Sequence, residues 1–191
     1  MLIIGNGESR KDIDVSKWQG TRIGCNAIHR DFAVEHLVCV DRRMVQEAIN
    51  ASYNGSLYTR HDWAGYFQNV KTVPKLPYKG TERWDEPFQW GSGPYAVLLG
   101  AKLSKKCTII GFDLYSEHKT VNNIYKGTKG YDSAEKHTVD PRYWIHQIAM
   151  VFKCFPKNKF TIFSKSNWKM PETWYLNNVS LDNIDNFLYN K

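Results

Sequence analysis

The sequence predicts a single α/β domain of Rossmann-like type, in which helices flank a mostly parallel sheet. Short apolar runs recur along the chain, and several are apolar at nearly every position, as expected of strands covered by helices on both faces. Helix patterns lie between some of these runs, and such alternation is typical of a parallel sheet. With 191 residues, 42% of them hydrophobic, the chain can bury a core of its own, so we expect one domain over residues 1–191.

The expected strands are the short apolar runs. They cover residues 2–4, 21–25, 36–40, 57–59, 70–73, 107–111 and 160–163. The expected helices cover residues 42–50, 94–103, 140–155 and 180–189. Pro94 and Pro141 suit a first helical turn, and Asp140 and Ser180 suit the N-cap position.

A polar segment rich in lysine and tyrosine, residues 115–137, interrupts this alternation. It follows the carboxyl end of an expected strand, where open α/β sheets bind their ligands. A long loop at such a place is often functional. We therefore expect a lid there.

Composition narrows the classes of partner. The formal net charge of +7 favours an anionic partner such as a nucleotide, a nucleic acid or an acidic lipid headgroup. Aromatic residues make up 14% of the chain, which suits a site for flat or sugar-like ligands.

The location of the protein is expected to be cytoplasmic. No stretch approaches the roughly 18 apolar residues of a membrane span, and the first residues do not resemble a signal peptide. The four cysteines show no C-x-x-C spacing and are expected to be free thiols in a reducing compartment; they are Cys25, Cys39, Cys107 and Cys154.

The first expected strand ends in a G-N-G turn formed by Gly5, Asn6 and Gly7. The dinucleotide fingerprint G-x-G-x-x-G would require a third glycine where Arg10 stands, and an acidic residue near Asn26. Both departures argue against NAD. Two interpretations remain open: the turn directs backbone donors and two amides at a nucleotide or sugar phosphate, or it is a glycine turn with asparagines capping strand ends.

No metal site is expected. The sequence contains one D-x-D, formed by Asp12 and Asp14, as a metal-dependent sugar transferase would need. It falls in the loop after the glycine turn, where Asp14 equally suits the cap of a short helix. The histidines show no ligand spacing.

Four segments in order resemble a known family. They are IIGNGES at 3–9, GCNAIHRD at 24–31, GSGPYAVLLGA at 91–101 and IIGFDLY at 109–115. They are similar to the bacterial glycosyltransferase family 42 sialyltransferases and to the related DUF115 family, which includes archaeal pterin pyrophosphokinase-like proteins. The resemblance spans about residues 2–164.

The resemblance implies a Rossmann-like domain with a small lid that transfers sugar from CMP-sialic acid with inversion and without a metal. Asn6 and Asn26 would contact the cytidine nucleotide and its ribose, within a donor site that includes Gly5, Gly7 and Gly93. Ser92 would hold the sugar carboxylate or a neighbouring group. A helix beginning near Gly93 would also present free N–H groups to an anion.

The resemblance also implies three catalytic side chains. Tyr115 and Tyr125 would donate hydrogen bonds to the leaving phosphate as its charge develops. His137 would act as the general base that takes the proton of the acceptor hydroxyl. The alternatives are that the tyrosines only pack the loop and that His137 is a solvated residue ahead of a helix.

Two positions depart from the family pattern. Glu8 replaces a proline and brings a negative charge to the expected phosphate site. Asp41 replaces an asparagine of the donor site and is followed by Arg42 and Arg43. Asp41 either forms an ion pair with these arginines or recognises a different sugar donor.

The leading hypothesis is a metal-independent glycosyltransferase with a CMP-linked sugar donor and an unidentified hydroxyl acceptor. One alternative is a Mg²⁺-dependent pyrophosphokinase, for which Asp41 and Asp113 are the plausible carboxylates. Another is a non-catalytic module that binds a nucleotide or nucleic acid.

Overall fold

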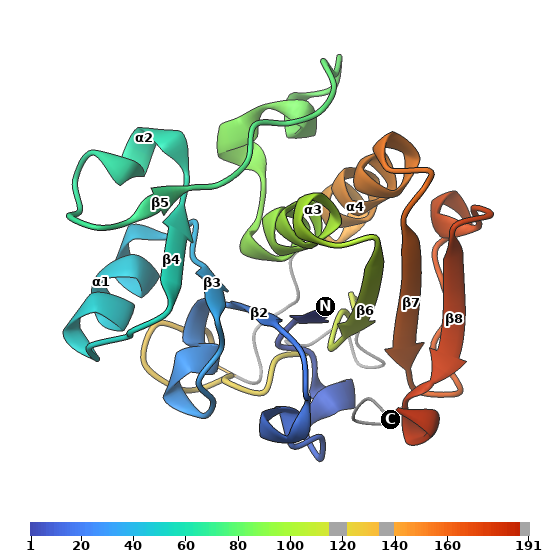
Figure 1. The fold of residues 1–191 in the computed structure, drawn as a ribbon, viewed down its shortest axis with the longest axis horizontal. Helices are drawn as coiled ribbons and strands as arrows, with labels where there is room; N and C mark the ends of the chain where they lie inside the picture. The colour runs from blue at the N-terminus through green and yellow to red at the C-terminus, as the bar shows by residue number, and fades with distance from the viewer. Residues whose placement is uncertain (115–121, 134–139, 188–191) are drawn as a thin grey trace.

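The computed structural model describes residues 1–114, 122–133 and 140–187. These residues contain one sheet of eight strands in the order β5-β4-β3-β2-β1-β6-β7-β8, and every neighbouring pair is parallel (Figure 1). The strands are β1 (Leu2–Ile4), β2 (Arg22–Cys25), β3 (His36–Val38), β4 (Ser56–Thr59), β5 (Lys71–Thr72), β6 (Lys106–Ile110), β7 (Lys159–Ser164) and β8 (Val179–Asn183). The predicted parallel α/β domain is confirmed.

Helices cover both faces of the sheet. The α-helices of the described chain are α1 (Arg42–Asn50), α2 (His61–Ala64), α3 (Ser92–Leu103) and α4 (Arg142–Cys154). Helices α3 and α4 pack against each other over one face, where Ile3 and Ile109 point into a core with them. Leu2 and Ile4 point to the other face and pack with α1 and several short 3₁₀ turns. Strands buried on both faces explain the nearly continuous apolar runs of the sequence.

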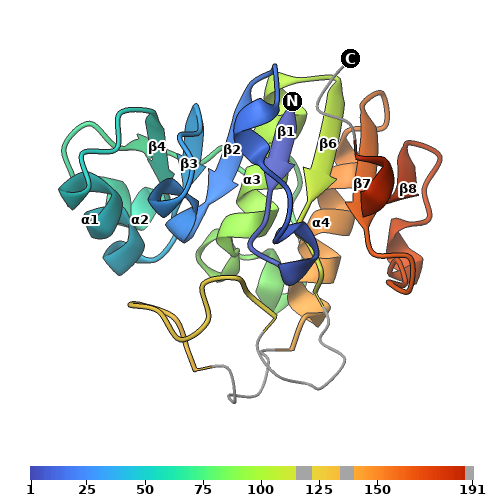
Figure 2. The same ribbon diagram turned by 90° about the horizontal axis from the view of Figure 1, so that it is seen from below.

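The order of the strands places a ligand site at the middle of the sheet. From β1 the chain adds β2 to β5 on one side, and α3 then carries it back to β6 on the other side of β1. The carboxyl ends of β1 and β6 therefore form the topological switch point, where open α/β sheets bind ligands. Residues 122–133 cross below the arrowheads of the strands at this edge (Figure 2).

The predicted helix over residues 180–189 is wrong. Residues 179–183 form β8, which pairs with β7 from Phe160↔Val179 to Ser164↔Asn183, and a 3₁₀ turn over Ile184–Asn186 follows. Most of β8 is exposed because it is an edge strand, so its sequence lacks the apolar run that marks a buried strand. Pairing with a distant strand overrides the local pattern.

The other predicted helices and the predicted state of the cysteines agree more closely with the structure. Helix α4 begins two residues after Asp140, whose carboxylate nevertheless accepts a hydrogen bond from the Arg142 N–H over 3.0 Å. Helix α3 begins at Ser92, two residues before the predicted start. The cysteines are free, and all except the half-buried Cys154 are buried. In the part of the chain that is described, no helix is long and apolar enough to cross a bilayer.

Candidate functional site

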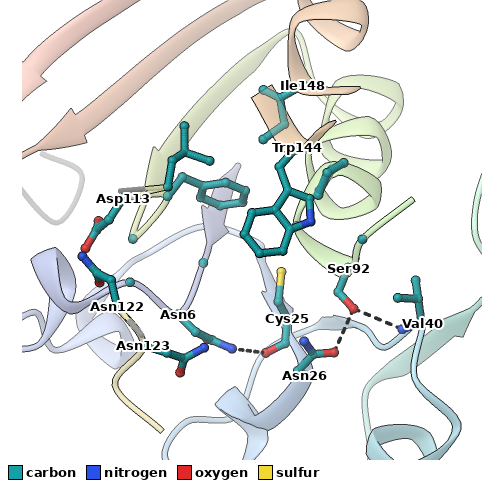
Figure 3. A pocket seen from close by; sticks show the side chains of 18 of the residues that line it. Asn6, Cys25, Asn26, Val40, Ser92, Asp113, Asn122, Asn123, Trp144 and Ile148 are labelled. Carbon is teal, nitrogen blue, oxygen red and sulfur yellow. Dashed lines mark hydrogen bonds between the residues drawn. The ribbon is translucent and has the colours of Figure 1, made fainter. Parts of the chain in front are cut away.

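A cavity of about 450 Å³ lies at the carboxyl edge of the sheet, between the ends of β1, β2, β3 and β6 and the beginning of α3 (Figure 3). The four segments that carry the family resemblance all contribute to its wall. Their lining residues are Gly5, Asn6, Gly7, Cys25, Asn26, Gly91, Ser92, Gly93, Pro94, Gly111, Phe112, Asp113 and Leu114. Segments more than 80 residues apart in the chain thus meet at one site, as their positions after strands predict.

The G-N-G turn packs closely against the end of β6. The Gly5 N–H donates to the Ile110 carbonyl over 2.8 Å, and the Gly7 N–H donates to the Gly111 carbonyl over 2.9 Å. A Cβ on Gly5 would lie 2.2 Å from the Gly111 oxygen, and one on Gly7 would lie 2.4 Å from the carboxyl carbon of Asp113. Packing against backbone therefore requires glycine at position 5, whereas a Cβ at position 7 would have to displace the Asp113 side chain, whatever the turn binds.

The buried side chain of Arg10 forms hydrogen bonds with the G-N-G turn. Its side chain is 1% exposed, and its Nε donates to the Gly5 carbonyl over 2.6 Å. Its Nη2 reaches Oδ1 of Asn6 at 3.3 Å. Arg10 occupies the third position of the dinucleotide fingerprint, so a buried guanidinium replaces the glycine that would let a helix approach.

The Asn6 side chain is occupied by protein partners. Its amide nitrogen donates to the Cys25 carbonyl over 3.1 Å and reaches the Tyr131 hydroxyl at 3.4 Å. With Arg10 on its oxygen, this amide joins the ends of β1 and β2. Its predicted contact with a nucleotide stays a prediction.

Asn26 and Ser92 form the opposite wall. Asn26 has a positive φ of 50°, and its Oδ1 accepts a hydrogen bond from the Ser92 hydroxyl over 2.8 Å. The Ser92 oxygen in turn accepts from the Val40 N–H over 3.1 Å. Within the described chain the Nδ2 of Asn26 donates no hydrogen bond, so it remains available to a ligand.

The amino end of α3 opens into the same cavity. Gly91 is its N-cap and offers no side-chain cap, while Ser92 and Gly93 begin the first turn and line the cavity. Their N–H groups precede the first intrahelical bond, which is donated by Tyr95 to the Gly91 carbonyl. Free N–H groups and the positive end of the helix dipole favour an anion here.

Three aspartates line the cavity, and among its described lining residues there is no lysine, arginine or histidine. Asp113 is 6% exposed and accepts hydrogen bonds from the backbone and hydroxyl of Ser9. Asp41 accepts from the Arg43 N–H over 2.9 Å and pairs with its guanidinium at 3.0 Å. Burial alone would raise the pKa of Asp41, but the Arg43 interactions outweigh it and lower that pKa. The internal ion pair considered for Asp41 is therefore present.

The predicted catalytic residues are only partly described. Tyr115 and His137 lie outside the described residues. Tyr125 is buried beside the cavity rather than in its lining, and its hydroxyl donates to Asp31 over 2.6 Å. Its role on a leaving phosphate stays a prediction.

Tyr131, which the sequence analysis did not single out, lines the cavity. Its oxygen accepts from Asn6 and from the Ala27 N–H, each at 3.4 Å, so its own proton is not used by the described residues. Burial raises the pKa of Tyr131 to about 12, which keeps it protonated at neutral pH. The sequence feature that could have indicated Tyr131 as a site residue is its position in the tyrosine-rich segment, six residues after Tyr125.

The described part of the lid is attached to the turn that it covers. The Ile124 N–H donates to the Asn6 carbonyl over 2.9 Å, and Asn122 accepts from the Glu8 N–H over 2.8 Å. The carboxylate of Glu8 pairs with Lys126 at 2.5 Å. The acidic residue that departs from the family pattern thus anchors the lid.

Metal ligands do not cluster among the described residues, where no group of three or more histidine, cysteine, aspartate or glutamate side chains is placed to hold an ion. Asp14 caps the 3₁₀ turn Val15–Lys17 by accepting from the Ser16 N–H over 3.1 Å.

No family model, curated protein or solved structure matches the chain.

Proposed function

We propose that the protein is a metal-independent glycosyltransferase that uses a nucleotide-activated sugar, most simply a CMP-linked one. The observation that carries the proposal is the meeting of four distant segments at one cavity, with the amino end of α3 opening into it. A volume of about 450 Å³ falls within the usual range for a small-molecule site.

The donor would bind along the wall formed by Asn26, Ser92 and Gly93. The free N–H groups of Ser92 and Gly93 suit the single phosphate of a CMP-sugar, which carries little charge into a cavity lined by aspartates. The Nδ2 of Asn26 suits a ribose hydroxyl or the base. Trp144 (Figure 3) and Phe112 also line the cavity, next to Gly91 and Gly93 respectively, and offer aromatic rings to the ligand.

In the transfer, the acceptor oxygen bonds to the anomeric carbon while the bond from that carbon to the phosphate oxygen breaks. The electron pair stays on the phosphate, where the free proton of Tyr131 would stabilise it. The proton of the acceptor hydroxyl passes to a general base, for which the family resemblance indicates His137. Tyr115 would assist at the phosphate by the same resemblance.

A second candidate is Mg²⁺-dependent diphosphoryl transfer from ATP. The observation that favours it is the acidic lining, because Asp41 and Asp113 are oxygen ligands of the type that Mg²⁺ prefers. Asp41 is already paired with Arg43, and Asp113 with Ser9, which reduces their capacity to hold an ion.

The deciding experiment is a thermal-shift panel of CMP, CDP, UMP, UDP, AMP, ATP, GDP and NAD, each with and without Mg²⁺. Selective stabilisation by CMP or CDP without metal is the expected result, because a ligand that binds the native state raises Tm. Stabilisation by ATP only with Mg²⁺ would replace the proposal with the second candidate. No shift with any nucleotide would reject both.

A variant of a cavity residue tests whether the increase in Tm with CMP comes from binding in this cavity. Asn26→Gly tolerates the positive φ of this position and removes the amide, so it should keep the fold and lose most of the CMP shift. His137→Ala should abolish transfer from CMP-sialic acid and leave CMP binding nearly intact. Full activity in the His137 variant would reject that residue as the base.

A further inference from the structure

Exposed lysines gather at the edge of the sheet opposite to the cavity, where the strands begin. They lie at the carboxyl ends of α3 and α4, at the amino ends of β6 and β7, and in the connections between these elements. Figure 2 shows the amino end of β6 and the loop between α4 and β7 at the top, on the opposite side of the molecule from residues 122–133. We call these residues the amino-edge lysines: Lys102, Lys105, Lys106, Lys153, Lys157 and Lys159.

Hydrogen bonds hold the two lysine-bearing connections together. The buried side chain of Asn158 donates to the Ala101 carbonyl over 2.7 Å and to the Ser104 carbonyl over 3.0 Å. The Lys159 N–H donates to the Lys105 carbonyl over 2.7 Å. The connection from α3 to β6 and the connection from α4 to β7 therefore form one platform, which fixes the backbone positions of the lysines relative to one another.

Among the described residues, no carboxylate pairs with the amino-edge lysines. Residues 87–112 and 141–171, which contain all of these lysines, include no aspartate or glutamate. Further along the same edge, Glu35 precedes β3, but its carboxylate is already paired with Arg22 at 2.7 Å. The positive charge of this edge is therefore unbalanced within the part of the chain that is described.

Two of the amino-edge lysines lie directly opposite each other in the sheet. Lys106 of β6 is in register with Lys159 of β7, and neighbouring strands are only about 4.8 Å apart. Like charges at such positions destabilise a sheet. The helix dipoles favour lysines in the last turns of α3 and α4, but no such effect applies to the first residues of two strands. The fold thus retains a repulsive pair, and an anion from outside the chain would relieve it.

The lysine-bearing segments, residues 102–106 and 153–159, indicate the kind of anion. Single-stranded nucleic acid is held by stacking on aromatic rings, but the only aromatic residue of these segments is Phe155, which packs against the core. Stable attachment to a membrane needs a buried apolar group beside a basic cluster, and these segments expose a single large apolar side chain, Leu103, at 50%. Ammonium groups contact phosphates as point charges. The surface therefore best fits the dense phosphate backbone of a duplex.

We infer that the amino-edge lysines bind the phosphate backbone of a double-stranded nucleic acid without regard to its sequence. The sequence pI of about 9.2 agrees with this class of partner. The duplex lies across the starts of β6 and β7, at the opposite end of the strands from the cavity, and leaves the cavity open. The inference does not depend on the proposed glycosyl transfer.

Fluorescence anisotropy of labelled duplexes tests the inference on the full chain. Two DNA duplexes of unrelated sequence and one RNA duplex are titrated with the protein between about 50 and 200 mM salt. The logarithm of the association constant should fall linearly with the logarithm of the salt concentration, with a slope of about −4 to −5, because each phosphate contact releases counterions. The two DNA sequences should bind equally well.

The double variant Lys106→Gln/Lys159→Gln removes the opposed pair of charges. It should make the slope less steep by about two and weaken binding at least about tenfold at the lowest salt. Its Tm should not fall, because a repulsion is removed. Lys165→Gln/Lys169→Gln is the matched control, since it removes the same charge from exposed positions beyond the carboxyl end of β7 and should bind the duplex almost as the wild type does.

A single strand of the same DNA sequence and vesicles of phosphatidylcholine with phosphatidylserine serve as further probes. The inference is overturned if neither the DNA nor the RNA duplexes bind, or if the two double variants lose the same affinity. It is also overturned if only the single strand or only the vesicles bind. None of these outcomes bears on the proposed transfer, which the nucleotide panel tests separately.

Discussion

The hydroxyl of Ser92 donates a hydrogen bond to Oδ1 of Asn26 over 2.8 Å and so joins the first turn of α3 to the residue that follows β2. Its oxygen also accepts the Val40 N–H, which brings the segment after β3 to the same point. One side chain therefore sets the position of the helix dipole relative to the free amide of Asn26. A site arranged in this way before binding loses less entropy when the ligand arrives.

Replacing this side chain tests its role directly. Ser92→Ala should lower the free energy of unfolding by about 1–3 kcal/mol, because the Val40 N–H loses its acceptor. It should also reduce the CMP thermal shift. Urea denaturation measures the first effect, and Ser180→Ala on the exposed edge strand is the control. Unchanged stability in Ser92→Ala would show that water replaces the hydroxyl.

Gly7 gives a second prediction. Its φ of −66° suits any residue, so the only obstacle to Gly7→Ala is the Asp113 carboxylate, 2.4 Å from the new Cβ. Displacing that carboxylate should cost about 1–3 kcal/mol and weaken nucleotide binding.

Gly65→Ala is the matched control for this substitution. Gly65 also has a φ of −66°, and nothing lies within 4 Å of its Cβ position. The control should be neutral or slightly stabilising. Equal midpoints of urea denaturation for the two variants would refute the packing role of Gly7.

Arg10 gives a third prediction. Arg10→Leu should lower the free energy of unfolding by about 1.5–3 kcal/mol, because the Gly5 carbonyl loses a charged donor. Arg142→Leu removes an exposed guanidinium paired with Asp140 and should leave the free energy of unfolding almost unchanged. Similar losses in both variants would mean that the buried contacts of Arg10 contribute little.

The sequence predicted the sheet well because its central strands are buried on both faces and carry continuous apolar runs. It failed at β8, whose exposed residues show no such run and whose strand exists through pairing with β7. It also missed the four-residue helix α2. Local periodicity reports burial, whereas edge pairing depends on residues far away in the chain.

At the candidate site, too, the sequence predicted some features and missed others. Glycines and asparagines directly after strands predicted the wall that contains Gly5, Asn26 and Gly93. The sequence did not predict the role of Tyr131, because the contact of its hydroxyl with the Ala27 N–H joins residues that are far apart in the chain. It did not predict the role of Arg10 either, because the hydrogen bonds of Arg10 to Gly5 and Asn6 depend on the shape of the turn, which a comparison with the glycine fingerprint does not give. No rule of spacing along the sequence relates Tyr131 to Ala27.

The network around Asp85 predicts how stability depends on pH. Burial alone would raise the pKa of Asp85, but hydrogen bonds from His146, the Glu82 N–H and Tyr78 outweigh it and hold that pKa below its ordinary value. A depressed carboxyl pKa stabilises the fold above the pKa of the unfolded chain, about 3.9, and this contribution is lost as the pH falls through the folded pKa. The difference in free energy of unfolding between wild type and Asp85→Asn should therefore be largest above about pH 5 and shrink below about pH 4. Tyr78→Phe keeps the carboxylate and removes one donor, so it should show a smaller pH dependence than the wild type. Urea denaturation from pH 3 to pH 7 measures all three proteins, and a difference that stays constant over this range would mean that the charge of Asp85 does not stabilise the loop.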